Sequence, residues 1–247
     1  MLQGIRMTHD TYTFGEGGVR SATRFAVKTR RFADRVTLGW LLATAVTSAS
    51  PAGELAMSVM DREGHGVDDV VVTVAPLEKH GVTAALTTAV MDQRNVAFVP
   101  RVLVVPVGTN VDFPNNDKVS HQVYSFSPAK KFQLPLYKGA PHTPVTFDHE
   151  GLVVLGCNIH DAMAGYIYVT DAPLFGKTDE TGVLHLQNVP PGDYRITVWS
   201  PYISDPLPSL ISTIHMDVRG TMAHRVQLTH ELRMRPEPRP RRADWDY

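Results

Sequence analysis

The 247-residue sequence contains a single cysteine, Cys157, which excludes an internal disulfide bond as a source of stability. An excess of charge of one sign is also missing. The chain has 24 Lys and Arg residues and 25 Asp and Glu residues, so its net charge does not indicate a nucleic-acid partner. No Ser-His-Asp order, paired-carboxylate context or glycine-rich phosphate loop is evident, so the common catalytic motifs are absent. With 43% hydrophobic residues, the chain can still bury the core of one large or two small domains.

Long apolar runs are scarce too. The stretch Val36–Val46 is about eleven residues, too short to span a bilayer comfortably. It follows a basic stretch and precedes the small residues at 47–50, which is the three-part pattern of a secretory signal. We therefore predict that residues 1–49 are a leader cleaved after Ala49, that the protein is periplasmic or secreted, and that no stable membrane span remains after cleavage. A buried helix or an uncleaved anchor is the alternative. The basic residues are Lys28, Arg30, Arg31 and Arg35.

Beyond the leader, β-strand signals dominate and no segment shows a strong helical period. Short runs rich in β-branched residues recur roughly every eight to twelve residues, separated by turns rich in Gly, Pro and Asp. This spacing predicts an all-β protein built as an antiparallel sandwich. The predicted strands are Glu54–Met60, Val67–Val74, Val96–Phe98, Arg101–Val105, Asn110–Phe113, Gln122–Phe126, Thr143–Phe147, Leu152–Leu155, Gly165–Val169, Val183–Leu186, Tyr194–Trp199, Ile211–Val218 and His224–Leu228.

Three side chains that bind metals lie close together in the order Cys157-x-x-His160-x-x-Met163, and His121 lies upstream. A thiolate, two imidazoles and a weak thioether are the donor set of a blue-copper electron-transfer site. Zinc is the rival metal, because one Cys and two His suit it as well. Zinc does not ask for a thioether, so Met163 favours one type 1 copper ion. An unpaired cysteine in an exported protein also needs a role, as a reactive thiol or as a ligand.

Three of these donors can share one loop between two strands. We expect Cys157 to end one strand, His160 to lie on the loop, and Met163 to precede the next strand. His121 must then come from a distant strand that the sandwich brings alongside. The other histidines of this region, His142 and His149, lie in turn-rich sequence that does not fit the ligand pattern, and we do not expect them to bind metal.

These motifs resemble those of the cupredoxins, the type 1 blue copper proteins that include plastocyanin and amicyanin. The ligand loop has the short Cys-x-x-His-x-x-Met form, and the stretch from Phe113 to His121 matches Phe-x-Asn-Asn-x-x-x-x-His. The likeness covers about residues 90–171 and implies a Greek-key β-sandwich. The phrase from Leu155 to Ile167 also looks like exported cupredoxin-like proteins known as methylamine utilization proteins. The sequence departs from many family members by having Val153 and Leu155, not aromatics, before the cysteine.

The resemblance also implies roles for residues around the ligands. The backbone N–H of Gln122 is expected to point at the Cys157 sulfur, where a hydrogen bond withdraws thiolate charge. Asn116 is expected to tie the two ligand loops together. His160 is expected to present one ring edge to solvent as the electron port, through an apolar collar. The candidate collar residues are Pro114, Ala162 and Ala164.

The segments on either side of residues 90–171 carry further β signals. Residues 50–89 are an N-terminal β segment, in which Leu55–Val74 resembles the beginning of a carboxypeptidase-regulatory-like or transthyretin-like β-sandwich. Residues 172–230 are a C-terminal β segment that resembles the end of one. The cupredoxin-like segment therefore either interrupts a small sandwich made by these two segments, or all the strands form one enlarged sandwich. Residues 231–247 are rich in Arg and Pro and are predicted to be a disordered tail.

The leading functional hypothesis is an exported mononuclear type 1 copper protein that transfers single electrons and is not an enzyme. Its partner would be a periplasmic dehydrogenase, a c-type cytochrome or a terminal oxidase. Two alternatives stay open: a periplasmic copper carrier or sensor without redox cycling, and a non-catalytic β-sandwich binding module. A copper oxidase is the least favoured reading, because no His-x-His pair supplies a second type of copper site.

Overall fold

The computed structural model describes residues 53–78, 88–139, 143–218 and 220–233. The predicted leader and all but the first three residues of the predicted tail lie outside these ranges, as does His142. The predicted all-β architecture is confirmed: within the described ranges every regular element is a strand except a 3₁₀ turn, η1 (Leu207–Leu210). No helix in these ranges is long and apolar enough to cross a membrane.

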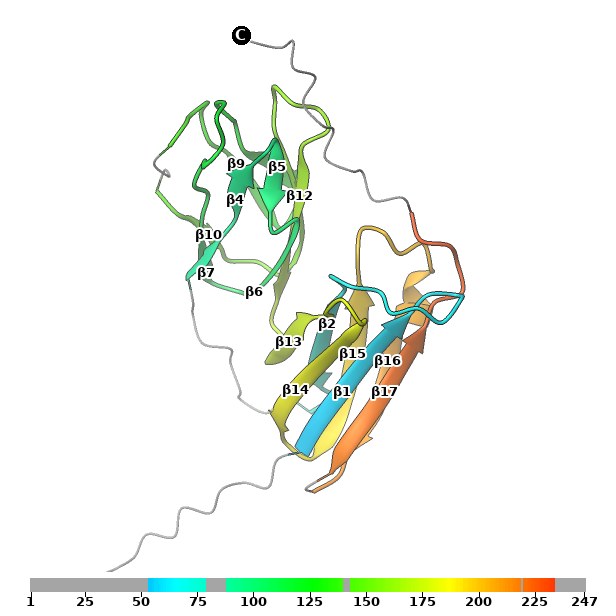
Figure 1. The fold of residues 1–247 in the computed structure, drawn as a ribbon. Coiled ribbons are helices and arrows are strands. Elements are labelled where there is room, and N and C mark those ends of the chain that lie inside the picture. The colour runs from blue at the N-terminus through cyan, green and yellow to red at the C-terminus, as the bar shows by residue number, and fades with distance from the viewer. Residues whose placement is uncertain (1–52, 79–87, 140–142, 219, 234–247) are drawn as a thin grey trace, which may run out of the picture. The chain divides into compact units, whose positions relative to one another are not determined.

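Strands from the two flanking segments pair with each other and form two sheets (Figure 1). The order of the first is β14 (Val183–Val189), β1 (Gly53–Met60) and β17 (Thr221–Gln227). The order of the second is β13 (Leu174–Lys177), β2 (Val71–Pro76), β15 (Gly192–Trp199) and β16 (Ile211–Met216). Strand β1 shows why the chain folds this way, because Leu55, Met57 and Val59 are buried while the residues between them are part-exposed.

Residues between these flanks form three further sheets. The largest has the order β6 (Val102–Pro106), β12 (Ala164–Thr170), β11 (Gly151–Gly156), β8 (Tyr124–Ser127) and β9 (Lys130–Gln133). A second has the order β10 (Val145–Phe147), β7 (Thr109–Asp112) and β3 (Thr88–Val90). The third pairs β4 (Asp92–Arg94) with β5 (Ala97–Val99).

The buried apolar side chains of the described ranges gather in two clusters. One belongs to the flanking sheets and includes Leu55, Val72 and Ile196. The other belongs to the central sheets and includes Phe147 and Cys157. The cysteine therefore lies at the edge of a hydrophobic core of its own and does not depend on the flanking cluster for its burial.

Strand direction differs from the prediction, because the sandwich is not purely antiparallel. Strands β1 and β17, β3 and β7, and β6 and β12 run parallel. Parallel neighbours need a long crossover, here of more than fifty residues between β6 and β12. Regular strand spacing along a sequence carries no information about such distant pairs, so the prediction of direction was wrong for these three.

Four short strands, β3, β4, β9 and β13, were not predicted. Strand β9 has the sequence Lys-Lys-Phe-Gln, which lacks apolar alternation, and it forms because β8 supplies an antiparallel partner through the turn between them. The predicted strand at Val67–Val74 begins only at Val71, although Val67 and Val70 are buried. A run of valines predicts burial more reliably than it predicts strand pairing.

Phe147 is the anchor of the central cluster and gives a first testable prediction. Its side chain is fully buried, and its ring centroid lies 6.5 Å from that of Phe113 and 6.0 Å from that of Phe132. We expect Phe147→Ala to lower the free energy of unfolding by about 3–5 kcal/mol in urea denaturation, because the core cannot close the cavity. The matched control is Phe126→Ala. Since Phe126 is 74% exposed, its loss should change stability by less than about 0.5 kcal/mol. Equal losses in the two variants would contradict this core assignment.

Candidate metal centre

The predicted ligand loop is the connection between two paired strands. Cys157 follows β11 and Met163 precedes β12, as predicted, and the register pairs Gly156 with Ala164 across the base of the loop. Inside the loop, the N–H of His160 donates to the Cys157 carbonyl at 3.4 Å, and the N–H of Met163 donates to the His160 carbonyl at 2.8 Å. These two hydrogen-bonded turns make the loop compact, so they fix the positions of Cys157, His160 and Met163 relative to one another.

Gly156 lets the neighbouring strand approach the loop. It pairs with Tyr124 of β8, and a Cβ atom at this position would lie 2.7 Å from the Tyr124 ring. A larger residue would therefore force the Tyr124 ring to move. The glycine makes room for this ring immediately before the cysteine.

His121 lies on the segment that leads into β8, and a two-way backbone bridge to Tyr137 fixes it. The N–H of His121 donates to the Tyr137 carbonyl at 2.9 Å, and the N–H of Tyr137 donates back at 3.0 Å. The His121 side chain is fully buried. An imidazole held in this way has one position, which makes it a pre-organised ligand rather than a surface side chain.

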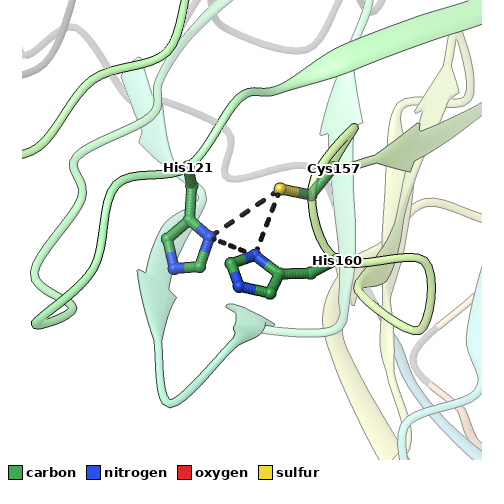
Figure 2. Close-up of side chains that lie close together, drawn as sticks. All are labelled: His121, Cys157 and His160. Atoms are coloured by element: carbon green, nitrogen blue, oxygen red, sulfur yellow. Dashed lines mark hydrogen bonds between the residues drawn. The ribbon is translucent and has the colours of Figure 1, made fainter. Parts of the chain in front are cut away.

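The structure brings three of the predicted ligands together although His121 is 36 residues from Cys157 (Figure 2). The Nδ1 atoms of His121 and His160 are 3.2 Å apart, and they lie 3.8 Å and 3.6 Å from the Cys157 Sγ. A point equidistant from three atoms so spaced lies about 2.1 Å from each, close to the 2.0–2.3 Å of metal–nitrogen and metal–sulfur bonds. The donor set therefore fits a single metal ion without rearrangement. No other group of three His, Cys, Asp or Glu side chains with this property occurs among the described residues.

Met163, the fourth predicted ligand, is buried on the same side of the core. It is 2% exposed, belongs to the same apolar cluster as Cys157, and lines with it an open pocket of about 450 Å³. Tyr124, Phe126 and Val154 also line this pocket. The two residues thus share apolar surroundings, which suit a weak, soft thioether donor.

The surroundings of Cys157 favour its thiolate. Burial alone raises the pKa of the thiol, but hydrogen bonds from His121, from the backbone N–H groups of Gln122 and Ile159, and from His160 outweigh it and lower the pKa to about 6. Among these, the hydrogen bond from the Gln122 N–H is the one that the resemblance implies. A thiolate is the form that binds soft metals, so the site is prepared for metal without the cost of removing a proton at neutral pH.

This lowered pKa gives a second prediction, for the metal-free protein. Ultraviolet absorption of the thiolate should grow with a midpoint near pH 6, against about 9 for the same protein in denaturant. Because the pKa is lower in the folded chain, the thiolate stabilises the fold fully above about pH 9, and that stabilisation is lost as the pH falls through 6. Cys157 is the only cysteine, so the signal has one source. A midpoint above 8 in the folded protein would contradict the arrangement.

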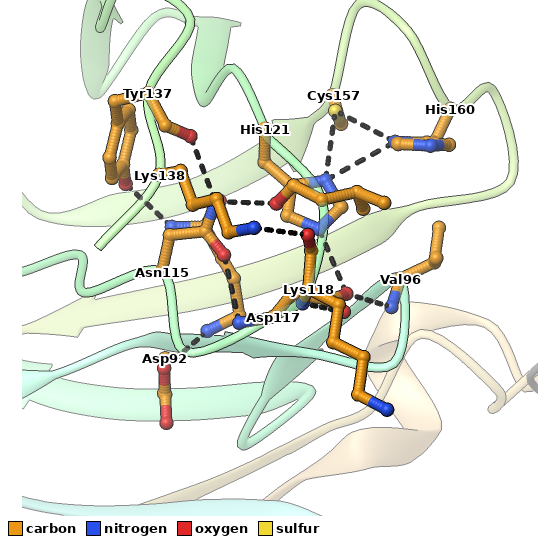
Figure 3. Close-up of polar contacts among 12 residues, drawn as sticks. Asp92, Val96, Asn115, Asp117, Lys118, His121, Tyr137, Lys138, Cys157 and His160 are labelled. Carbon is orange, nitrogen blue, oxygen red and sulfur yellow. Dashed lines mark hydrogen bonds and ion pairs between the residues drawn. The ribbon is translucent and has the colours of Figure 1, made fainter. Parts of the chain in front are cut away.

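A carboxylate that the sequence analysis did not single out lies directly behind His121 (Figure 3). The Nε2 of His121 is 3.0 Å from the Asp117 Oδ2, and both side chains are buried. Burial opposes charge on the ring, but contacts with Cys157 and Asp117 raise the pKa of His121. Burial likewise opposes the Asp117 carboxylate, yet hydrogen bonds from the Val96 N–H, His121 and the Lys118 N–H lower its pKa. The spacing Asp-x-x-x-His was the one signal in the sequence for this contact.

Asn116 does not tie the two ligand loops together, which corrects the expectation drawn from the resemblance. Its amide instead donates to both carboxylate oxygens of Asp92, at 3.0 and 3.1 Å. The preceding residue organises the His121 loop. The Asn115 amide donates to the carbonyls of Val119 at 3.0 Å and Tyr137 at 2.8 Å, so it ties the loop to the segment that also holds His121. Two adjacent asparagines cannot be told apart from sequence, because only the local backbone decides which one points inward.

His160 is the half-buried member of the group, whereas His121 and Cys157 are buried. Its neighbour Ile159 is 53% exposed, and of the three expected collar residues Pro114 and Ala164 are half-buried while Ala162 is exposed. The site thus has one imidazole that reaches the surface among apolar side chains. His149 lies at the surface, where its Nδ1 is 3.1 Å from the Asp148 Oδ1.

Comparisons with known proteins return structural matches alone. No family model matches the chain, and no curated protein matches it. A purple cupredoxin from Nitrosopumilus maritimus is 25% identical, with a TM-score of 0.30 over 34% of this chain and 99% of its own. A reduced mutant form of amicyanin is 22% identical, with a TM-score of 0.31 over 40% of this chain and 99% of its own.

A copper-containing nitrite reductase from Thermus scotoductus SA-01 is 26% identical, with a TM-score of 0.32 over 38% of this chain. This chain spans only 25% of the reductase. Since all three matches have low TM-scores and cover less than half of this chain, the assignment of the site depends on the site's own geometry.

Proposed function

We propose that the chain is a mononuclear type 1 copper protein that transfers single electrons. The observation that carries the proposal is the triangle of two imidazole nitrogens and one sulfur with sides of 3.2, 3.6 and 3.8 Å. These three donors, with a thioether close by, are the ligand set of a blue-copper centre. Copper bound there would supply a one-electron Cu(II)/Cu(I) couple.

The protein's own part is to hold the ligands still. Cys157 is fixed by N–H groups from two segments, His121 by Tyr137 and Asp117, and His160 by the loop turns. Because these positions are set before any metal arrives, the ligands need not move when the charge at the centre changes. A small structural change on electron gain or loss is what makes electron transfer fast.

The burial of Cys157 and the partial exposure of His160 define the two ends of the proposed electron route. Cys157 is 3% exposed and continues directly into β11, so its thiolate connects the centre to the backbone of the central sheet. His160 reaches the surface, and its exposed edge is the contact point for a redox partner. We propose that this partner is a periplasmic dehydrogenase, a c-type cytochrome or a terminal oxidase. The leader at 1–49 would direct the chain to the periplasm. The likeness of residues 155–167 to methylamine utilization proteins makes an amine-oxidising dehydrogenase one candidate donor.

The test is the visible spectrum of the protein loaded with Cu(II), with the zinc-loaded protein as a colourless control. We expect an intense thiolate-to-copper charge-transfer band and reversible bleaching by a one-electron reductant. A copper carrier that holds Cu(I) at the same ligands is the second candidate, favoured only by the surface position of His160. A colourless protein that binds Cu(I) tightly and passes it to a chelator would support the carrier and defeat the proposal.

A further inference from the structure

A buried carboxylate lies in line with one of the metal-binding imidazoles. The His121 ring offers Nδ1 to Cys157 and His160, while its opposite nitrogen, Nε2, faces the Asp117 Oδ2 at 3.0 Å (Figure 3). The exposed fractions of the two side chains are 0% and 2%. A carboxylate can only accept here, so Nε2 is the nitrogen that keeps its proton when a metal binds, and Nδ1 is the nitrogen whose lone pair can then face the metal.

We propose that Asp117 is a positioning residue of this centre, which holds His121 in its metal-binding tautomer and whose negative charge favours Cu(II) over Cu(I). The inference rests on the proposed function, since it concerns the same site. A carboxylate behind a metal-bound histidine fixes the ring and raises its basicity. The consequence for function is a centre of lower reduction potential than the four ligands alone would give.

Asp117 is itself held so that it cannot turn away from His121. Its Oδ2 accepts from the Val96 N–H at 2.7 Å, and its Oδ1 accepts from the Lys118 N–H at 2.6 Å. Its own N–H donates to the Asn115 Oδ1 at 3.0 Å. The carboxylate is thereby held by the residue just before β5 and by the His121 loop, and the Asp117 backbone is held by Asn115. A hydrogen bond with such fixed ends is a constraint on the ring rather than a chance contact.

The sign of the electrostatic effect follows from charge alone. The oxidised centre carries one more positive charge than the reduced one, so a fixed negative charge nearby stabilises the oxidised form more. Because Asp117 and His121 are buried, water screens this interaction less than at the surface.

The experiment compares Asp117→Asn with Asp92→Asn in the copper-loaded full chain. Asp92 is the control, because it is also a buried carboxylate of this loop network. It accepts from the Gln93 N–H at 2.7 Å and from Asn116, and it forms an ion pair with Arg94, whose side chain is 60% exposed. It makes no hydrogen bond to a ligand residue. We expect Asp117→Asn to lower the ratio of Cu(II) to Cu(I) affinity by about tenfold, which is a rise of ~59 mV in reduction potential. Asp92→Asn should lose stability without this shift, and Asp117→Glu should restore part of the lower potential.

A second readout does not need copper. In the metal-free protein, the Nε2 proton of His121 should give a slowly exchanging, downfield NMR signal in the wild type, and this signal should move or vanish in Asp117→Asn but not in Asp92→Asn. Equal potentials for the two Asn variants, with an unchanged His121 signal, would overturn the inference even if the wild type is blue. A wild type that fails to form the blue band would defeat the proposed function, and the NMR comparison would then still decide whether Asp117 positions His121.

Discussion

The Cys157→Ser variant loaded with Cu(II) is expected to lose the visible charge-transfer band completely. The band requires a sulfur bound to copper, and the chain has one cysteine. A serine hydroxyl is also a poor anionic ligand near neutral pH, unlike a thiol whose pKa is about 6. Loss of an outer partner of a metal ligand costs 10–100-fold in affinity, so loss of a ligand itself should cost roughly 100-fold or more in Cu(II) binding.

The control for this variant is a measurement that its fold is unchanged. Serine is close to cysteine in size, and the N–H groups of Gln122 and Ile159 that donate to the thiolate can donate to its hydroxyl. Far-ultraviolet circular dichroism should therefore match the wild type, with a stability loss of about 1–3 kcal/mol from burying the hydroxyl. Survival of the visible band in a folded Cys157→Ser protein would show that the sulfur has been assigned wrongly, and the electron-transfer proposal would fail with it.

The ligand loop could be predicted from sequence because its geometry is local. A strand, a seven-residue loop and a returning strand form a hairpin whose ends are fixed by pairing, so Cys157, His160 and Met163 keep their order in space. The place of His121 beside them was predicted only through the motif that begins at Phe113. Nothing local in the sequence connects residues 36 apart, and it is the central sheets that bring them together.

The parts that could not be predicted depend on long-range pairing or on side-chain direction. The resemblance of the flanking segments to one small sandwich offered their pairing as one of two alternatives, but no periodicity encodes that β1 pairs with β14 and β17, more than 120 residues later. Whether Asn115 or Asn116 points into the loop is a matter of one backbone turn. The contact of Asp117 with His121 was not predicted, because a carboxylate four residues before a histidine is usually exposed. An exposed pair of this kind contributes little, whereas this pair is buried.

The two histidine variants are expected to behave differently toward added imidazole, although each should lose the blue band. His160→Gly removes a half-buried ring at the surface, so free imidazole can diffuse into the gap and restore the band. His121→Gly removes a fully buried ring, so free imidazole has no direct way in from solvent. It also leaves Asp117 buried without the donor it faced, which costs about 1–3 kcal/mol or more.

Titration of each Cu(II)-loaded variant with imidazole, followed by visible absorption, measures this difference, and His149→Gly serves as the control. His149 is a surface residue beside Asp148, so its loss should leave the band unchanged without any imidazole. Rescue should be complete and saturable for His160→Gly and absent for His121→Gly. Because the two rings contribute equivalent nitrogens to the same triangle, the difference in outcome reflects the burial of His121 and its contact with Asp117. Equal rescue of the two variants would mean that the His121 position is open to solvent. The interpretation of His121 as a buried, pre-organised ligand would then be wrong.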